Sequence, residues 1–431
     1  MTACAIEPGA TPEETTPEEG APQVECTISA DGAYAARLAL DGGSWFPERW
    51  TLDGPEPYAV PLPGNQPEEP GTEVQPMGDG RVLIRRLVDG RHVFTLLYPT
   101  GPGTGEVLIG GVECPDEDTR LRLLPPAPGG EKAYALAVGR RASTLWLVAG
   151  GSFGPEHVAE IPGRCSGGVW LDRTGRMLAL DREVGGCTKA IVVDLERAGE
   201  VSPLLQIAAG SDDRLLLADP DSGLLLIRSD APSPGEDRLG WGVLGSTLPV
   251  RFPESLRLPD CAVTPFAIQP GLVLMPESCA VALRVDGPVG SWVGVWRPSE
   301  RRMLHLPAPE GWLAGTGLWS TDGVLQLPFT TAEVPCGVAR VAVPWGETGG
   351  SGDAGMTGET GGSGDAGGAG PGGSDRGGTT VQAASGSSSP VADGSSQPDP
   401  PVPAVSAVSA VPSAPRPVPL GKAPLARLVT N

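Results

Sequence analysis

Residues 167–207 have the sequence GGVWLDRTGRMLALDREVGGCTKAIVVDLERAGEVSPLLQI. It contains four short apolar runs, which are GGVWL, RMLAL, KAIVVDL and VSPLLQI. Each run is five to seven residues long and is separated from the next by a turn or a polar loop. Runs of this length with such boundaries are typical of β-strands. The stretch therefore predicts an antiparallel meander of four strands.

The same unit recurs along residues 26–345. Residues 82–110 repeat it as VLIRRL, HVFTLLY and EVLIG, and residues 133–161 repeat it as AYALAV, TLWLVA and HVAEI. A turn separates the first two strands of each unit, and the turn glycines are 45 to 52 residues apart. The turns are Asp31-Gly32, Asp79-Gly80, Gly129-Gly130, Thr174-Gly175, Ser222-Gly223, Pro270-Gly271 and Asp322-Gly323. Because glycine adopts the positive φ of tight hairpins without steric cost, these seven turns predict seven units.

A ring of these units buries what a single unit exposes. One four-stranded meander has two apolar faces and an open edge, and stacking seven meanders radially covers the faces and leaves only short edges. A solenoid would need shorter units or helices, and no 3.6-residue period persists in this chain for more than two turns. We therefore predict an all-β fold, a seven-bladed β-propeller of four-stranded antiparallel blades with disordered termini.

Two of the seven units are irregular. In the sixth, both Pro270-Gly271 and the later hairpin around residues 286–291 compete to be the first turn, so the strand boundaries within residues 262–296 stay open. In the seventh, only three strands precede a glycine-rich segment. A three-stranded last blade is favoured, and residues 425–429 are an alternative source of a fourth strand.

Several segments resemble parts of known propellers. The turn ISADG at residues 28–32 and the turn WLDRTG at residues 170–175 resemble the turn between the first two strands of TolB-like and WD-repeat-like bacterial propellers. TLWLVAGG and KAIVVDLERAGE resemble the third strand and the following turn of such blades. The resemblance covers residues 26–345 and implies a propeller with a general binding role. Similar propellers gate the catalytic domain of prolyl-oligopeptidase-like hydrolases, but no catalytic residue can be carried over to this chain.

Composition divides the chain into three parts. Residues 1–25 contain six acidic residues and no basic one, which predicts a disordered acidic arm. Residues 26–345 form the predicted propeller. In residues 346–431 the unit GETGGSGDAG occurs twice, before Gly/Ser-rich and Pro/Ala-rich stretches, which predicts a disordered tail. The end of this tail is basic and is either a short docking segment or a plain disordered terminus. Its candidate docking residues are Arg416, Lys422, Leu425, Arg427 and Leu428.

The charge of the chain restricts its partners. The formal net charge is −21, of which −12 remains for residues 26–345 after the two terminal parts are subtracted. Binding to nucleic acid or to an anionic membrane depends on Lys and Arg, so neither partner is expected. No apolar stretch approaches the length of a membrane span, no basic n-region precedes an apolar segment at the start, and the eight cysteines form no CxxC pair. These features predict a cytoplasmic protein with free thiols, and we expect a monomer.

Three motifs superficially suggest chemistry. GGSFG at residues 150–154 fits G-x-S-x-G, but a nucleophile elbow needs a long helix after it, and Pro162 follows closely. TGPGTGEV at residues 100–107 lacks the Lys of a phosphate-binding loop, and residues 219–223 lack the later acidic ligands of a calcium loop. All three are interpreted as turns. With only three histidines and no pair at metal-ligand spacing, we predict no catalytic residue, no metal site and no cofactor.

The best functional signal is a set of acidic loops. The loop before the first strand of a unit should lie on one face of the ring, around the channel mouth, and five of these loops carry carboxylates. The predicted binding residues are Glu73, Asp116, Glu117, Asp118, Asp212, Asp213 and Asp260. The same loops also carry Glu68, Glu69 and Glu113, and a further loop carries Glu310. Cys26, Cys114, Cys165 and Cys261 also fall near the starts of first strands. The carboxylates either keep the loops solvated or form a cation-selective face for a basic peptide.

The sequence thus favours a non-catalytic propeller that acts as an interaction platform for a protein or a basic peptide. The alternative is a propeller enzyme that uses rim carboxylates, or an accessory or gating subunit of a separately encoded serine hydrolase. The shortage of histidine argues against the enzymatic alternative without excluding carboxylate-only catalysis.

Overall fold

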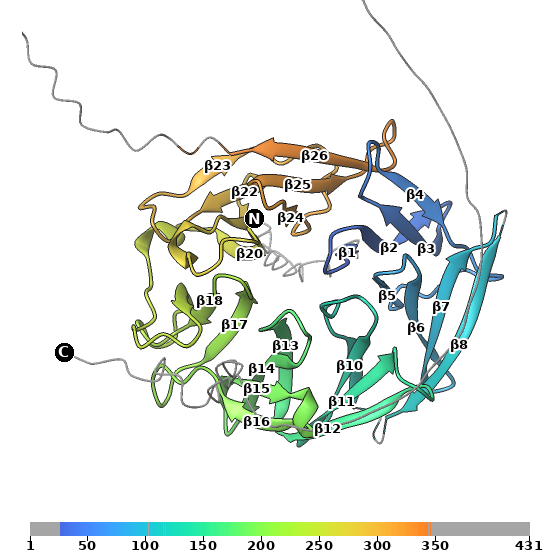
Figure 1. Ribbon diagram of the computed structural model, residues 1–431, viewed down its shortest axis with the longest axis horizontal. Helices are drawn as coiled ribbons and strands as arrows, with labels where there is room; N and C mark the ends of the chain where they lie inside the picture. The colour runs from blue at the N-terminus through green and yellow to red at the C-terminus, as the bar shows by residue number, and fades with distance from the viewer. Residues whose placement is uncertain (1–25, 102, 115, 117, 344, 346–431) are drawn as a thin grey trace, which may run out of the picture. The chain divides into compact units, whose positions relative to one another are not determined.

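A computed structural model describes residues 26–343 and 345, apart from residues 102, 115 and 117 (Figure 1). These residues form seven blades arranged in a ring, with the first strand of each blade innermost. Blades 1 to 3 are β1 (Cys26–Ile28), β2 (Tyr34–Asp41), β3 (Ser44–Thr51) and β4 (Tyr58–Pro61); β5 (Glu73–Pro76), β6 (Val82–Val88), β7 (Arg91–Pro99) and β8 (Thr104–Glu113); and β9 (Arg120–Leu123), β10 (Ala133–Val138), β11 (Ala142–Ala149) and β12 (Glu156–Pro162).

The remaining blades follow the same plan. They are β13 (Arg164–Trp170), β14 (Met177–Val184), β15 (Cys187–Asp194) and β16 (Glu200–Pro203); β17 (Asp213–Ala218), β18 (Leu224–Ser229) and β19 (Arg238–Val243); β20 (Ala262–Ile268), β21 (Val281–Gly287), β22 (Gly290–Trp296) and β23 (Leu304–Leu306); and β24 (Leu318–Trp319), β25 (Val324–Phe329) and β26 (Gly337–Ala342). Neighbouring strands within each blade are antiparallel. The predicted seven-bladed propeller is confirmed.

The seven predicted turns all lie between the first and second strands of their blades. Gly32, Gly80, Gly175, Gly223 and Gly323 have φ between 69° and 84°, a region that side-chain-bearing residues rarely adopt. At Gly80 space is restricted as well, because an added Cβ would lie 2.9 Å from the Tyr34 ring. The periodic glycines therefore mark a real repeat of the backbone.

Blades 5 and 7 lack a regular fourth strand, and blade 6 has four strands but a long first connection. In blade 5, a single bridge between Trp241 and Arg251 takes the place of the fourth strand, which the sequence pattern did not indicate. In blade 6, Pro270-Gly271 belongs to a long connection between β20 and β21 that includes a short 3-10 helix at Pro276–Ser278. In blade 7 the described residues supply three strands, as expected, and residues 425–429 lie outside the described residues.

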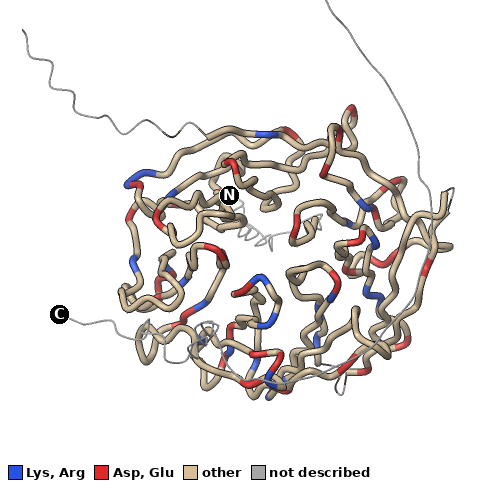
Figure 2. Tube along the Cα trace, viewed as in Figure 1, with Lys and Arg blue, Asp and Glu red and all other residues tan. Residues whose placement is uncertain are grey.

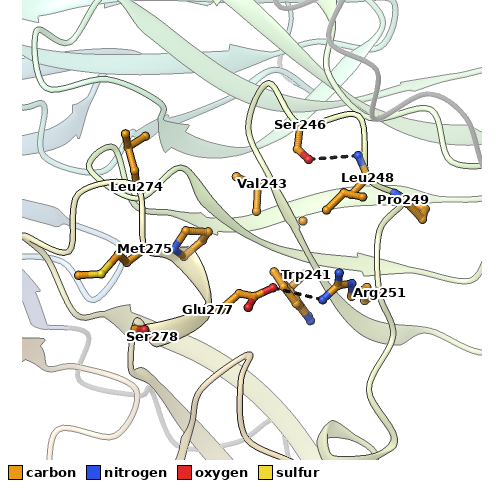
Figure 3. Close-up of a pocket in the computed structure, with 12 residues that line it drawn as sticks. Trp241, Val243, Ser246, Leu248, Pro249, Arg251, Leu274, Met275, Glu277 and Ser278 are labelled. Atoms are coloured by element: carbon orange, nitrogen blue, oxygen red, sulfur yellow. Dashed lines mark hydrogen bonds and ion pairs between the residues drawn. The ribbon is translucent and has the colours of Figure 1, made fainter.

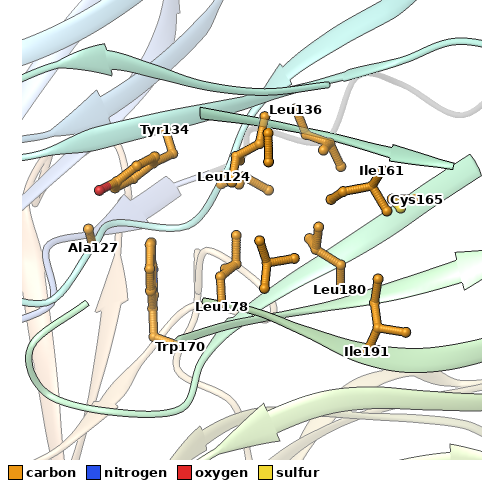
Figure 4. Packing of buried hydrophobic residues seen from close by; sticks show 13 residues of the cluster. Leu124, Ala127, Tyr134, Leu136, Ile161, Cys165, Trp170, Leu178, Leu180 and Ile191 are labelled. Atoms are coloured by element: carbon orange, nitrogen blue, oxygen red, sulfur yellow. The ribbon is translucent and has the colours of Figure 1, made fainter. Parts of the chain in front are cut away.

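The hydrophobic core lies between blades. Figure 4 shows the cluster between blades 3 and 4, where Leu136 and Ile161 of one blade face Leu178 and Leu180 of the next. The rings of Tyr134 and Trp170 close one end of this cluster, with 5.4 Å between their centroids. Similar clusters join blades 1 and 2, 2 and 3, 4 and 5, and 5 and 6.

The same kind of packing closes the ring between blades 7 and 1. Leu313 of blade 7 shares a cluster with the fully buried Trp50 of blade 1. The Thr316 hydroxyl donates a hydrogen bond of 3.1 Å to the carbonyl oxygen of Cys26. Among the described residues, closure therefore relies on side-chain packing and not on a strand shared between the two blades.

The alternating strands give the ring two faces with different loops. One side of the ring carries the loops between one blade and the next, and we call it the connection face. These loops are at residues 62–72, 114–119, 204–212, 252–261 and 307–317. The opposite side carries the seven turns described above, and we call it the hairpin face. No helix in the described part of the chain is long and apolar enough to span a bilayer.

Candidate functional site

A large groove lies on the connection face, over blades 2 and 3. Its volume is about 1290 Å³, and its walls are the loop at residues 64–72, strands β6 and β9, and the loop at residues 114–119. Typical small-molecule pockets measure roughly 300–1,000 Å³. We call it the connection-face groove, and of the predicted carboxylates Glu68, Glu69, Glu73 and Asp116 line it.

Two of these carboxylates are already paired with arginine. Glu68 is buried and accepts hydrogen bonds from Arg86, the shortest of which is 2.6 Å. Glu73 accepts from the Nε of Arg85 at 3.1 Å and from the backbone N–H of Leu123 at 2.6 Å. Because Leu123 belongs to blade 3, Glu73 ties blade 3 to blade 2. Both carboxylates are therefore structural and add no free negative charge to the groove.

Arg85 also fixes a histidine in the groove. Its guanidinium lies 3.1 Å from the Nδ1 of His92, and both side chains are buried. Burial lowers the pKa of His92, and the charge of Arg85 lowers it further. His92 is therefore neutral at pH 7, with Nδ1 accepting a hydrogen bond from Arg85. This contact helps to hold the Arg85 guanidinium in place.

Glu69 and Asp116 differ from Glu68 and Glu73. Both are exposed, and neither forms an ion pair with a described residue. They lie on two different loops that border the same groove. Asp118 is exposed but paired with Arg140 of blade 3, and Glu117 lies outside the described residues. The unpaired negative charge of the groove is thus concentrated at Glu69 and Asp116.

The prediction that Asp213 lies on the acidic rim is corrected by the structure. Asp213 is fully buried, so it is not a rim residue. Its carboxylate accepts hydrogen bonds from Lys189 at 2.7 Å, from the hydroxyls of Ser211 and Ser229, and from the backbone of Ile207. The neighbouring Asp212 accepts from the backbone N–H of Thr188 at 2.7 Å. These partners join blades 4 and 5, and the sequence did not show them because they come from distant strands.

The other predicted acidic residues are dispersed. Asp260 and Glu310 are exposed on separate loops, and Glu113 is exposed 3.9 Å from Arg91. No group of three or more His, Cys, Asp or Glu within the described ranges has the arrangement of a metal site.

The seven described cysteines are free thiols. Burial raises the pKa of Cys26 and of Cys336 to about 12, so both remain protonated at neutral pH. Arg416, Lys422, Leu425, Arg427 and Leu428 lie outside the described residues.

The central channel carries a different charge from the one predicted. It encloses about 870 Å³, and its charged lining residues are Glu73, which is paired, and Arg122. Figure 2 shows acidic and basic residues interspersed around the whole ring, with both kinds near its centre. Sequence reasoning missed Arg122. The signal available for it was the alternation Arg120-Leu121-Arg122-Leu123 on an innermost strand, which places both arginines on one side of the strand.

The three suspected motifs are turns, as interpreted. Ser152 lies in the hairpin between β11 and β12, where its backbone N–H donates to Glu156 at 2.8 Å and no helix follows. The nearby His157 packs its ring against Trp146. Residues 100–103 connect β7 to β8, and the Asp219 carboxylate accepts from the backbone and hydroxyl of Ser222 within the turn.

A smaller cavity lies on the hairpin face between blades 5 and 6 (Figure 3). It encloses about 350 Å³ and is mostly apolar, with Leu248, Leu274 and Met275 around its opening. At one side the Arg251 guanidinium stacks on Trp241, 4.9 Å from the ring centroid, and pairs with Glu277 at 3.4 Å. Leu274 is exposed with a φ of +55°, an unusual conformation for leucine.

Comparisons with known proteins bear on the fold alone. No protein-family model and no curated protein sequence matches the chain. A putative TolB from Agrobacterium tumefaciens is similar, with 16% identity and a TM-score of 0.35 over 51% of this chain and 76% of that one. TolB from Acinetobacter baumannii has 12% identity and a TM-score of 0.42 over 64% of each chain. The β-propeller domain of the Trilobed protease from Pyrococcus furiosus has 11% identity and a TM-score of 0.42 over 71% of this chain and 90% of that one. All three TM-scores are below 0.5.

Proposed function

We propose that this protein is a non-catalytic interaction platform whose connection-face groove binds a basic segment of a protein or peptide. The observation that carries the proposal is the pair of exposed, unpaired carboxylates, Glu69 and Asp116, on two loops that border one groove. A basic segment in the groove could pair with either carboxylate without breaking an existing ion pair. The other groove carboxylates, Glu68 and Glu73, already have arginine partners.

The size and surroundings of the groove support a polypeptide ligand. Its volume of about 1290 Å³ exceeds that of a typical small-molecule pocket and suits an extended segment of several residues. The fixed ion pairs Glu68–Arg86 and Glu73–Arg85 supply oriented polar groups along its wall. The net charge of −12 over residues 26–345 attracts a basic partner and repels nucleic acid and anionic membranes. Seven free thiols agree with a cytoplasmic location, which is part of the proposal.

Fluorescence anisotropy tests the proposal directly. The probe is a labelled peptide of alternating Gly and Arg, titrated with the full chain at low ionic strength. An exposed charge pair contributes about 0.2–1 kcal/mol, so Glu69→Gln and Asp116→Asn should each weaken binding about 1.5- to 5-fold. The double variant should lose roughly the product of the two effects, and added salt should weaken the wild type more than the double variant.

Two controls make the result specific. Glu56→Gln removes one exposed carboxylate from the hairpin-face side of blade 1 and should leave the affinity unchanged. A peptide with citrulline in place of arginine keeps the shape but lacks the charge and should not bind. Equal affinity of the wild type and the double variant for the Arg peptide would contradict the proposal.

A further inference from the structure

Two arginines from different blades converge on two consecutive residues of the channel wall. Arg122, on β9 of blade 3, donates through Nη2 to the carbonyl oxygen of Gly167 at 2.9 Å. Arg214, on β17 of blade 5, reaches the hydroxyl of Ser166 at 3.4 Å and that of Thr188 at 3.1 Å. Ser166 and Gly167 are consecutive residues of β13 in blade 4. The two guanidiniums are thus held against the same short segment from opposite sides.

Neither of these two arginines has its positive charge paired with a described carboxylate, in contrast to several other arginines of the ring. Arg85, Arg86 and Arg176 each form an ion pair with a carboxylate at 3.1 Å or less. The described hydrogen bonds of Arg122 and Arg214 go only to carbonyl and hydroxyl oxygens, and neither forms an ion pair with a described carboxylate. These bonds use one of the five guanidinium N–H groups of Arg122 and two of those of Arg214, so donors remain for a ligand.

The wall between the arginines is open. Gly167 and Gly168 form a bulge in β13, with φ of +77° and +131°, and the register against β14 shifts there. Both glycines line the channel together with Arg122. A Cβ at Gly167 would lie 3.1 Å from Asp181 and one at Gly168 would lie 2.9 Å from Leu124, so side chains are excluded from this wall. The channel volume of about 870 Å³ leaves room for a ligand beside Arg122.

The acidic residue nearest to the arginines does not cancel their charge. Asp181 is buried behind the bulge, where its Oδ1 accepts from the backbone N–H of Leu215 at 3.0 Å. The acidic residue that does line the channel, Glu73, is paired with Arg85. One buried carboxylate thus faces two guanidiniums, and the local charge toward the channel is positive.

We propose that Arg122, assisted by the charge of Arg214, forms a carboxylate-binding site in the channel beside the Gly167-Gly168 bulge. A planar guanidinium matches a carboxylate with two parallel hydrogen bonds. The carboxylate comes either from the end of a peptide or from an acidic side chain. The site adjoins the connection-face groove, which Arg122 also lines, and its charge is opposite to that of Glu69 and Asp116.

Isothermal titration of the full chain tests the site with simple probes. N-acetyl-triglycine supplies a terminal carboxylate, N-acetyl-aspartic acid α-amide supplies a side-chain carboxylate, and N-acetyl-triglycine amide supplies neither. At least one acid should bind, and the amide should bind at least tenfold more weakly. Which acid binds more tightly identifies the source. Equal binding of acid and amide, or tighter binding of inorganic phosphate than of either acid, would overturn the proposal.

Variants separate the site from a general charge effect. Arg122→Gln should weaken binding of the preferred acid tenfold or more, the scale of a lost charged hydrogen bond, and Arg214→Gln should weaken it less. Arg122→Lys should recover part of the affinity because it restores the charge without the planar fork. Arg301→Gln removes an exposed positive charge from a loop of blade 6 and should change nothing. Unchanged affinity in Arg122→Gln would overturn the proposal.

Discussion

Replacing Asp181 by Asn should stabilise the protein more at high pH than at low pH. Asp181 is 5% exposed on β14, and burial raises its pKa from the ordinary 3.8 to about 6. The backbone N–H of Leu215 and the charges of Arg214 and Arg122 oppose this rise without cancelling it. Because the pKa is higher in the folded state, the protonated carboxyl favours folding at low pH. That contribution is lost as the pH rises through 6.

The size of the effect follows from the shift. A shift of about 2.2 units at about 1.4 kcal/mol per unit means that the ionised carboxylate costs about 3 kcal/mol once the pH is well above 6. About 1.4 kcal/mol of this cost develops between pH 5 and pH 8, from the linkage relation with pKa values of 3.8 and about 6. Asn does not ionise, so any fixed effect of the amide on packing is the same at both pH values and cancels.

The assay is urea denaturation of the full chain at pH 5 and pH 8, followed by tryptophan fluorescence. Both pH values lie above the pI of about 4.6. The free energy of unfolding of Asp181→Asn relative to wild type should be about 1.4 kcal/mol more favourable at pH 8 than at pH 5. Asp194→Asn is the control, because hydrogen bonds from Arg176 lower the pKa of Asp194 and keep it ionised at both values. A difference for Asp181→Asn that is equal at the two pH values would refute the reasoning.

Three further predictions concern packing, loop anchoring and thiol reactivity. Leu178→Ala should lower the free energy of unfolding by about 2–5 kcal/mol because its side chain is fully buried between blades, whereas Leu40→Ala at an exposed position should cost under about 0.5 kcal/mol in the same urea titration. Asp221→Asn should speed hydrogen exchange at Gly271, whose N–H donates to the Asp221 carboxylate at 2.8 Å; unchanged exchange would show that this contact does not hold the loop. Cys26, with a pKa of about 12, should resist iodoacetamide at pH 8 in the native state and react after unfolding, as peptide mass spectrometry can show.

The fold was predictable from sequence because its determinants are local and periodic. Each glycine turn encodes its own hairpin, and apolar runs such as RMLAL encode strands that must be covered on both faces. The fourth strand of blade 5 escaped prediction because it is reduced to one bridge at Arg251, with no apolar run to mark it. Irregular edges of this kind depend on neighbouring blades and leave little pattern in the chain.

The site was predictable only in outline. Topology correctly indicates which loops share a face, so Glu69 and Asp116 could be placed near each other in advance. Pairing could not be predicted, because the partners of Glu68 and Asp213 lie 18 and 24 residues away along the chain, on other strands. Arg122 went unnoticed for a related reason. An unpaired arginine is recognised only when the positions of all nearby carboxylates are known.

Hydrogen exchange of the full chain with and without the Gly/Arg peptide tests the central claim most directly. Binding in the connection-face groove should slow exchange in residues 64–72 and 114–121 and leave residues 269–280 on the hairpin face unchanged. Protection confined to residues 244–250 and 269–280, around the apolar pocket between blades 5 and 6, would contradict the claim and place binding on the opposite face.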